Sequence, residues 1–375
     1  MKKIIAMILA LVMCFSLVAC GGGDSQADDG ATKIKIGMVT DTGGINDQSF
    51  NQTTWEGLQA LVKEDPNFEI AHLVSETEAD YDTNIQTFID DGYDLVLCTG
   101  FALAEATRKA AEANPDQKFA IIDDATIDLP NVACLMFAQE QASYLVGIAA
   151  GMMTESNVIG YVQGMVFPTM NLFGIGFIEG VLSVNPDATV LQYNANSFGD
   201  AAAGATAVKN FVTQGADVVY HAAGATGAGV ITGCQENGIY AIGVDCDQAY
   251  LAPETVLTSA MKRVDIAAQD ISKAVKEGTF KGGVTMYDIT NGGVDIADLT
   301  REQNHTLAAH AARDAQVVER HVCRLDSDIR RLDGRRARKR FNDADASLAL
   351  CGLRAEQRRD DGGIDASHDR AVNDG

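Results

Sequence analysis

Two adjacent acidic residues, Asp123 and Asp124, end the apolar run KFAIIDD and are the first candidates for chemistry in this sequence. A pair of carboxylates could serve as general acid and general base in hydrolysis. Neighbouring side chains of a strand point to opposite faces, however, and no third group stands at a readable spacing. We therefore interpret the two carboxylates as acceptors for ligand hydroxyl groups rather than as catalytic groups. The sequence also has no HExxH, GxSxG or P-loop motif that would indicate an enzyme.

A glycine-rich stretch, DVVYHAAGATGAG at 217–229, imitates a dinucleotide-binding turn, and Asp245 stands where an acid would bind a ribose. The glycine order is G-x-x-G-x-G, which departs from the strict fingerprint. Close packing of a helix on a strand explains the glycines better, so we expect no nicotinamide cofactor. Backbone N–H groups at this helix start, next to Gly224, could still bind a ligand oxygen.

Polar and aromatic residues also follow most of the other apolar runs of strand length. They are Asp41, Asp47, Phe50, Asn51, Phe101, Phe173, Phe198 and Lys262. Carboxylates accept hydrogen bonds from hydroxyl groups, and aromatic rings cover flat faces. The inventory therefore suits a neutral, flat ligand that carries several hydroxyl groups.

The stretch DTGGINDQSFNQTTWEGL at 41–58 predicts a helix start. Ser49 and Gln52 fit a capping box, in which Ser49 caps the helix and Gln52 reaches back. Phe50 then falls in the first helical turn, where it either stacks on a ligand ring or plugs the end of the sheet. Trp55 lies off the predicted core stripe and is interpreted as a packing or rim residue.

No metal site is expected. His72 and His221 lie inside predicted strands without a His or Cys partner, and the cysteines of the body occur in or beside apolar runs without a CxxC spacing. The histidines are interpreted as core or surface residues rather than ligands, and the cysteines as small buried side chains rather than zinc ligands or a disulfide framework.

The elements that must position these residues alternate regularly. Ten apolar runs of strand length lie between Lys33 and about Thr300, and amphipathic helical patterns separate most of them. Such alternation indicates parallel sheets with helices on both faces, an α/β fold, and the number of strands suits two lobes. Ligands of such sheets bind at the carboxyl ends of the strands, so we expect a cleft between the lobes. We assign 33–139 with about 255–298 to the N-terminal lobe, and 140–254 to the C-terminal lobe.

The N-terminus resembles an export signal. Lys2 and Lys3 precede a short apolar stretch that ends in Leu-Val-Ala-Cys, the pattern of a lipoprotein signal in which residues 1–19 are removed and Cys20 receives a palmitate-type lipid. An ordinary secretory signal with a chance cysteine is the alternative. Residues 20–32 are rich in Gly and Asp and are predicted to be a flexible tether. The protein is thus expected outside the cytoplasm, held at the cell membrane by lipid.

The C-terminal part, 299–375, has a different composition. It carries 14 of the 16 arginines and no sustained helix or strand period. Its acidic and basic residues nearly cancel, which argues against a nucleic-acid arm. A disordered tail is possible, but the abrupt change from Lys to Arg favours a frameshift near Thr300, in which case the true C-terminal segment is missing.

The net charge of the chain is −23, and it resides almost wholly in residues 1–300. An acidic body of this kind argues against binding to nucleic acid and to anionic lipid surfaces.

Several stretches together resemble the basic membrane protein family, the PnrA-like lipoproteins that bind nucleosides for ABC transporters. These stretches are DTGGINDQSFNQTTWEGL, KFAIIDD, EQASYLVGIAAGMMT, DVVYHAAGATGAGV, AIGVDCDQ and LTSAMKRVD. The similarity covers roughly Ile34 to Asp298. It implies a type I periplasmic-binding-protein fold, no enzymatic activity, and permease and ATPase subunits as partners.

The resemblance also implies roles for particular residues. Phe50 matches the first aromatic that stacks on the base, and Phe198 the second, with Phe173 as an alternative. Asp47 and Asn51 match polar positions near the base. The remaining matches are two ribose-binding acids, a cleft glycine and a cleft lysine, namely Asp123, Asp245, Gly224 and Lys262. The implied ligand is a nucleoside, with a purine base expected; a sugar receptor of the same fold and a ligand-sensing regulatory lipoprotein remain alternatives.

Overall fold

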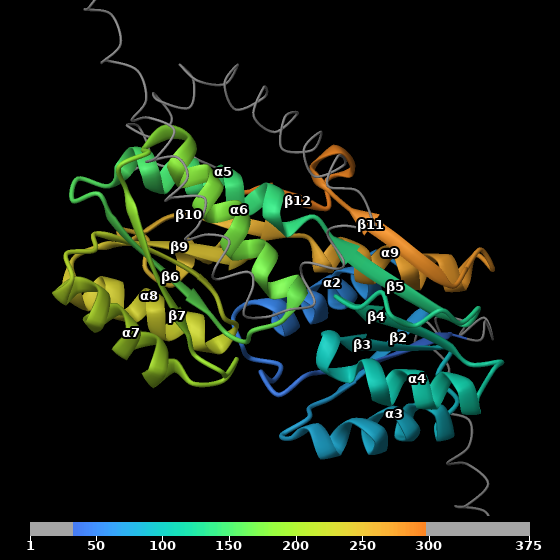
Figure 1. The fold of residues 1–375 in the computed structure, drawn as a ribbon. Helices are drawn as coiled ribbons and strands as arrows, with labels where there is room; N and C mark the ends of the chain where they lie inside the picture. Colours follow the sequence, from blue (N-terminus) through green and yellow to red (C-terminus); the bar gives the residue numbers. More distant parts are fainter. Residues whose placement is uncertain (1–32, 298–375) are drawn as a thin grey trace, which may run out of the picture. The chain divides into compact units, whose positions relative to one another are not determined.

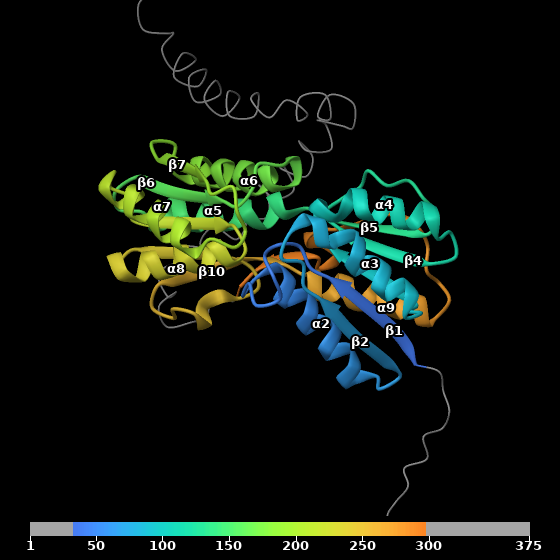
Figure 2. The ribbon, with the colours of Figure 1, turned by 90° about the horizontal axis from the view of Figure 1, so that it is seen from below.

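The computed structural model describes residues 33–297 of the protein. In this range the chain forms two six-stranded sheets with helices on both faces of each (Figures 1 and 2). The predicted signal, Cys20, the tether and the whole of the predicted aberrant tail, 299–375, lie outside the described residues. The predicted α/β class is confirmed.

The first sheet has the strand order β11-β5-β4-β3-β1-β2, and all its neighbours are parallel. In chain order its strands are β1 (Ile34–Val39), β2 (Phe68–Leu73), β3 (Leu95–Thr99), β4 (Lys118–Ile122), β5 (Val132–Phe137) and β11 (Gly283–Tyr287). The inner strands are buried on both faces, which is why they are continuous apolar runs in the sequence.

The second sheet has the order β12-β10-β9-β8-β6-β7 and is parallel except for β12, which runs antiparallel to β10. Its strands are β6 (Val158–Gln163), β7 (Thr189–Asn194), β8 (Val218–Ala222), β9 (Tyr240–Asp245), β10 (Val256–Lys262) and β12 (Val294–Ile296).

Two pairs of helices cover the first sheet and form the first lobe with it. The helices are α2 (Phe50–Glu64), α3 (Tyr81–Asp90), α4 (Ala104–Ala113) and α9 (Val264–Lys276). The helices α3 and α4 cover one face of the sheet, and α2 and α9 cover the other (Figure 2). Side chains along β3 alternate between the two faces of the sheet. Val96 therefore packs with residues of α3 and α4, whereas Leu95 and Leu97 pack with residues of α2 and α9.

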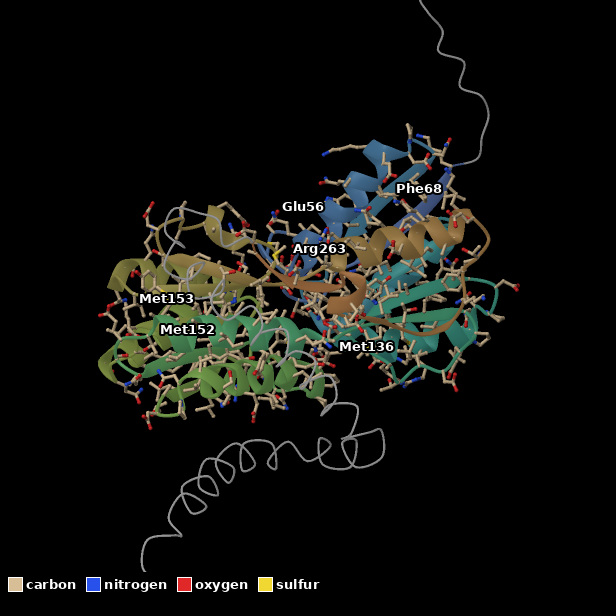
Figure 3. All side chains as sticks on the ribbon, turned by 90° about the horizontal axis from the view of Figure 1, so that it is seen from above. Glu56, Phe68, Met136, Met152, Met153 and Arg263 are labelled. Carbon is tan, nitrogen blue, oxygen red and sulfur yellow. The ribbon has the colours of Figure 1, made fainter. Side chains whose placement is uncertain are left out.

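The helices α2 and α9 lie side by side, around the labelled Glu56 and Arg263 in Figure 3. Gly57 permits this approach, since a Cβ atom at this position would lie 2.6 Å from backbone atoms of Asp265. The contact joins the beginning of the chain to a late segment.

Four helices cover the second sheet and form the second lobe with it: α5 (Gln139–Met153), α6 (Pro168–Val184), α7 (Ala201–Thr213) and α8 (Ala225–Asn237). α7 and α8 pack on one face, and α5 and α6 on the other. α5 and α6 are in close contact, because a Cβ atom at Gly147 would lie 2.2 Å from the Phe177 carbonyl oxygen. The labelled Met152 and Met153 end α5 (Figure 3).

The chain passes between the lobes three times: from β5 into α5, from β10 into α9, and from β11 through a short 3₁₀ turn into β12. The assignment of about 255–298 to the N-terminal lobe therefore needs correction. α9 and β11 do belong to the first lobe, but β10 and β12 are hydrogen-bonded into the second sheet. An apolar run in the sequence predicts a strand but does not indicate which of the two sheets the strand joins.

Candidate functional site

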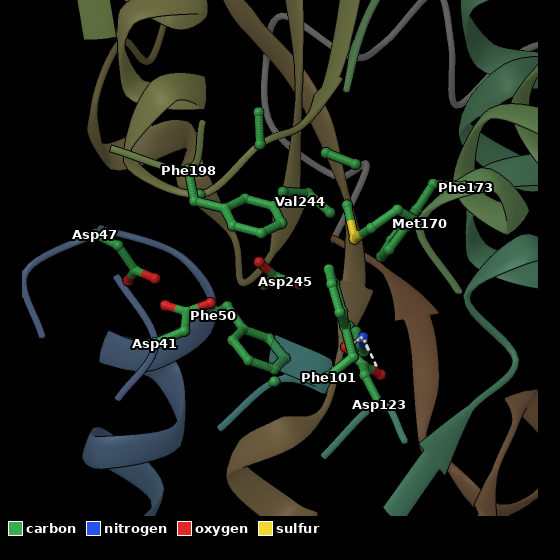
Figure 4. Close-up of a pocket in the computed structure, with 15 residues that line it drawn as sticks. Asp41, Asp47, Phe50, Phe101, Asp123, Met170, Phe173, Phe198, Val244 and Asp245 are labelled. Carbon is green, nitrogen blue, oxygen red and sulfur yellow. Dashed lines mark hydrogen bonds and ion pairs between the residues drawn. The ribbon is translucent and has the colours of Figure 1, made fainter. Parts of the chain in front are cut away.

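A pocket lies where the carboxyl ends of the two sheets face each other, and it encloses about 480 Å³ of space not filled by atoms, part of it open to solvent. Both lobes supply its walls (Figure 4). The lining residues are Asp41, Asp47, Phe50, Gly100, Phe101, Asp123, Met170, Phe173, Phe198, Ala222, Ala223, Gly224, Val244, Asp245 and Lys262. Seven of the eight predicted ligand-binding residues are among them; Asn51 is not.

Asp123 and Lys262 form a buried ion pair across the lobes. The Lys262 Nζ atom, at the end of β10, donates to both Asp123 carboxylate oxygens at 2.7 and 2.5 Å, and both residues are at most 4% exposed. The ammonium group also lies 5.1 Å from the centres of the Phe50 and Phe137 rings and 5.4 Å from that of Phe173. Paired and enclosed in this way, Lys262 presents a fixed positive charge to the pocket.

Asp245 is the matching acid of the second lobe. Asp123 follows the end of β4 and Asp245 ends β9, and both adopt the left-handed backbone region, with φ of 69° and 67°. Such conformations are costly for residues other than glycine and concentrate at functional sites. The Ser49 hydroxyl of the first lobe donates a short hydrogen bond to the Asp245 carboxylate. Burial raises the pKa of Asp245 to about 7, although nearby Lys262 and the Ser49 hydrogen bond oppose the shift.

Asp47 begins helix α2, and the predicted capping box is wrong. One Asp47 oxygen accepts from the backbone N–H groups of Ser49 and Gln52, at 3.0 Å each, and the other from that of Asn51 at 2.8 Å. The Ser49 side chain makes no cap and turns to Asp245 instead. Gln52 bonds only to the exposed Glu56 through its side chain. A carboxylate accepts several N–H bonds where a hydroxyl accepts fewer, so Asp47 takes over the orphan donors of this helix end.

Asn51 lies behind the pocket wall and holds Asp41. Its Nδ2 donates to Asp41 Oδ1 at 2.7 Å, while its Oδ1 accepts from the Thr99 hydroxyl at 2.6 Å. Asp41 also accepts from the Gly43 N–H at 2.9 Å. Burial raises the pKa of Asp41 to about 6 against these hydrogen bonds, which lower it. Asp41 rather than Asn51 thus faces the pocket.

Phenylalanine rings form two opposite walls of the pocket. Figure 4 places the Phe198 ring of the second lobe above the Phe50 ring of the first, with Asp245 between them in the view. Gly224 has φ +55°, and a Cβ atom there would lie 3.4 Å from the Phe198 Cβ. The lack of a side chain at Gly224 therefore allows Phe198 to pack against this backbone. On one side, Phe101 contacts Phe198 edge to face with centroids 6.4 Å apart.

Eight lining residues are not among the eight predicted ligand-binding residues, namely Asp41, Gly100, Phe101, Met170, Phe173, Ala222, Ala223 and Val244. Asp41 and Phe101 closely follow β1 and β3, and their positions after strands marked both as candidates in the sequence, although the resemblance gave neither a role. Met170 lies in the first turn of α6 and carries no such signal. Phe173, the alternative second aromatic, lines the pocket too, but next to Lys262.

The charge of the pocket limits its ligands. Four carboxyl groups, those of Asp41, Asp47, Asp123 and Asp245, face one cationic side chain, Lys262. An anionic ligand would therefore be repelled, whereas hydroxyl and N–H donors would find acceptors. Within residues 33–297, no group of three or more His, Cys, Asp or Glu side chains is arranged to hold a metal ion.

Fold and site together define a type I periplasmic binding protein. A solute-binding protein of an ABC transporter from Aeropyrum pernix superposes with a TM-score of 0.68 at 26% identity, over 86% of this chain and 92% of that one. The chain belongs to the Bmp family, described as PnrA-like substrate-binding proteins of ABC transporters, whose model matches residues 34–319. The match continues beyond Asp298, where the resemblance was expected to stop.

Relatives agree with this assignment. The nucleoside-binding protein BmpA of an ABC transporter from Lactococcus lactis is 37% identical over 79% of this chain and 91% of its own length. A CD4+ T-cell-stimulating antigen of Listeria innocua is 36% identical over the same shares. The chain is therefore an ABC transporter substrate-binding protein.

No helix among the described residues is both long enough and apolar enough to cross a membrane.

Proposed function

We propose that this protein is a nucleoside receptor that delivers its ligand to an ABC importer. The observation that carries the proposal is the pairing of Phe50 and Phe198, one from each lobe, on opposite walls of a pocket rich in carboxylates. A nucleoside has a flat base for the rings and hydroxyl groups for the acids. The name of the Lactococcus relative supports the same ligand class.

In the proposed complex, the base stacks between Phe50 and Phe198, and each stacked contact contributes about 0.5–1.5 kcal/mol beyond the burial of area. Asp123 and Asp245 accept from the ribose hydroxyl groups, and Lys262 donates to a ribose oxygen while it holds Asp123 in place. Asp41 accepts from N–H groups of the base. Asp47 and Asn51, whose polar atoms are engaged within the protein, position Phe50 and Asp41.

Closure of the lobes on the ligand is the signal that the transporter would read. The proposed partners are a membrane-embedded permease and a cytoplasmic ATPase, and the proposed anchor is a lipid on Cys20. The protein itself performs no catalysis in this scheme and needs no cofactor.

A thermal-shift panel of guanosine, adenosine, uridine, ribose and NAD tests the ligand class. A ligand at 100 times its Kd stabilises the folded state by about 2.7 kcal/mol, which is easily measured. We expect stabilisation by one or more nucleosides, and loss of that stabilisation in Phe50→Ala and Phe198→Ala. Tyr250→Ala, which truncates an exposed aromatic outside the pocket lining, serves as the control.

Other results would contradict the proposal. Stabilisation by ribose and by no nucleoside would make the protein a sugar receptor, whose hydroxyl groups the same carboxylates would hold. Turnover of a nucleoside by the purified protein would make it an enzyme.

A further inference from the structure

The one face-to-face aromatic stack that joins the lobes in residues 33–297 lies beside the pocket. The rings of Phe101 and Phe167 are 3.9 Å apart between centroids and are inclined by only 5°. Phe101 belongs to the 3₁₀ turn Phe101–Leu103 after β3 in the first lobe, and Phe167 precedes α6 in the second. The pair therefore exists only while the lobes are together.

Phe167 is held in position by its own lobe. Pro168 follows it, and a residue before proline is confined to the extended region; Phe167 has φ −151° and ψ 151°. Two residues later, the Thr169 carbonyl accepts from Gln139 Nε2 of α5 at 2.7 Å. The ring is thus presented to the first lobe by a rigid segment, so little conformational entropy is lost when the stack forms.

Phe101 connects this stack to the pocket. It lines the pocket and also meets Phe198 edge to face, whereas Phe167 is not among the lining residues. Thr169 strengthens the same junction, since its hydroxyl donates to the Asp123 carbonyl oxygen at 3.3 Å. One end of α6 therefore contacts the first lobe at two neighbouring points.

We propose that Phe167 is a latch and a positioning residue: by stacking on Phe101 it keeps the lobes closed and fixes the ring that borders Phe198, and so sets how slowly the ligand leaves. The inference rests on the proposed function for its ligand. Because Phe167 does not line the pocket, its effect is on lobe opening, which governs dissociation more than encounter.

Ligand kinetics on the full-length chain test the latch. Wild type and variants are loaded with radiolabelled adenosine, or with guanosine in a parallel series, and chased with excess unlabelled nucleoside. We expect Phe167→Ala to raise the dissociation rate about two- to tenfold, the range of one aromatic pair, with the association rate unchanged within about twofold. Phe167→Tyr, which keeps the ring, should behave like wild type, and Phe167→Leu, which keeps apolar volume only, should behave like Phe167→Ala.

Tyr240→Ala is the matched control. Tyr240 is 40% exposed and begins β9, at the opposite end of the strand from Asp245, so its truncation should leave the dissociation rate at the wild-type value. An unchanged rate in Phe167→Ala, or a wild-type rate in Phe167→Leu, would overturn the latch while leaving nucleoside binding intact.

A second measurement needs no ligand and separates the two hypotheses. Hydrogen–deuterium exchange reports opening at the Leu103 amide, which is bonded to the Gly100 carbonyl at 3.1 Å in the Phe101 turn. We expect faster exchange there in ligand-free Phe167→Ala than in wild type or Tyr240→Ala. If no nucleoside bound to wild type, the proposed function would fail, but this comparison would still decide the latch: equal exchange in the three proteins would overturn it.

Discussion

At the scale of single residues, the pocket is governed by how its charged groups are paired. Lys262 is almost fully buried, and its ammonium group is surrounded by the Asp123 carboxylate and three aromatic rings. Burying such a pair costs desolvation free energy that the pairing roughly offsets, so the pair matters most when one member is lost. It is retained, in our interpretation, because it brings a fixed donor and a fixed acceptor to one ligand.

Lys262→Met leaves the Asp123 carboxylate buried without its cation. We expect the free energy of unfolding to fall by about 3–5 kcal/mol, as for other broken buried pairs. The double variant Lys262→Met/Asp123→Asn removes the unpaired charge and should recover most of that loss. Urea denaturation followed by circular dichroism measures the differences.

Lys109→Met makes the same substitution in a pair whose two side chains are 60% and 61% exposed, with Asp82 as partner, and should leave the free energy of unfolding unchanged. A loss in Lys262→Met no larger than in Lys109→Met would mean that the buried pair contributes no more to stability than the exposed pair.

Sequence reasoning located most of the pocket because residues after parallel strands converge at one edge of each sheet. Asp123, Asp245 and Phe198 were found by that rule. Asn51 was assigned to the ligand, yet its side chain bonds to Asp41 and Thr99. Sequence cannot separate a group that contacts a ligand from one that holds such a group, because both are polar and both lie near the strand ends.

At the scale of elements, the start of α2 shows how local signals mislead. Ser-x-x-Gln satisfied the capping-box pattern, but the Ser49 hydroxyl has a long-range partner in Asp245, and Asp47 was free to take the helix end. The sheet assignment of β10 failed for a related reason. Its apolar run fits either sheet, and only its pairing with β9 and β12 places it.

Asp47→Ala should destabilise the protein by about 0.5–2 kcal/mol, because three backbone N–H groups at the start of α2 lose their acceptor. The amides of Ser49, Asn51 and Gln52 should exchange faster with solvent in this variant, and hydrogen–deuterium exchange measures this directly.

Gln52→Ala separates the observed cap from the expected one. The Gln52 side chain bonds only to exposed Glu56, so its truncation should leave both stability and exchange at wild-type values. If Gln52→Ala lowered the free energy of unfolding as much as Asp47→Ala, the result would support the capping box of Ser49 and Gln52 as the structure that caps the start of α2.

At the scale of the whole molecule, the two lobes are joined across the cleft by a few polar contacts as well as by three chain crossings. Gln248 Nε2 of the second lobe donates to the Gln48 carbonyl oxygen of the first at 2.8 Å, and Ser49 donates to Asp245. These contacts, together with the Phe101–Phe167 stack, hold the lobes together without filling the pocket. A ligand adds its own contacts between the lobes to these and so shifts the population further towards the closed arrangement.

Asp245 couples this arrangement to pH. Its carboxyl group loses its proton near pH 4 in an unfolded chain, but burial raises the pKa to about 7 in the folded protein. Between these values the folded state binds a proton that the unfolded state does not, so the contribution of Asp245 to stability is greatest below pH 4 and falls as the pH rises towards 7. Asp41, with a pKa raised to about 6, contributes in the same direction.

Ligand affinity should follow the opposite trend. An ionised Asp245 is the stronger acceptor for ribose hydroxyl groups, so Kd for a nucleoside should decrease as the pH rises from 6 to 8 while the melting temperature of the ligand-free protein decreases from pH 4 to 7. Asp245→Asn should flatten the melting-temperature profile and remove most of the pH dependence of Kd, as measured by thermal denaturation and isothermal titration calorimetry. If Asp245→Asn kept the wild-type pH dependence of both the melting temperature and Kd, Asp245 would not be the group responsible. Asp41→Asn would then test whether Asp41 is that group.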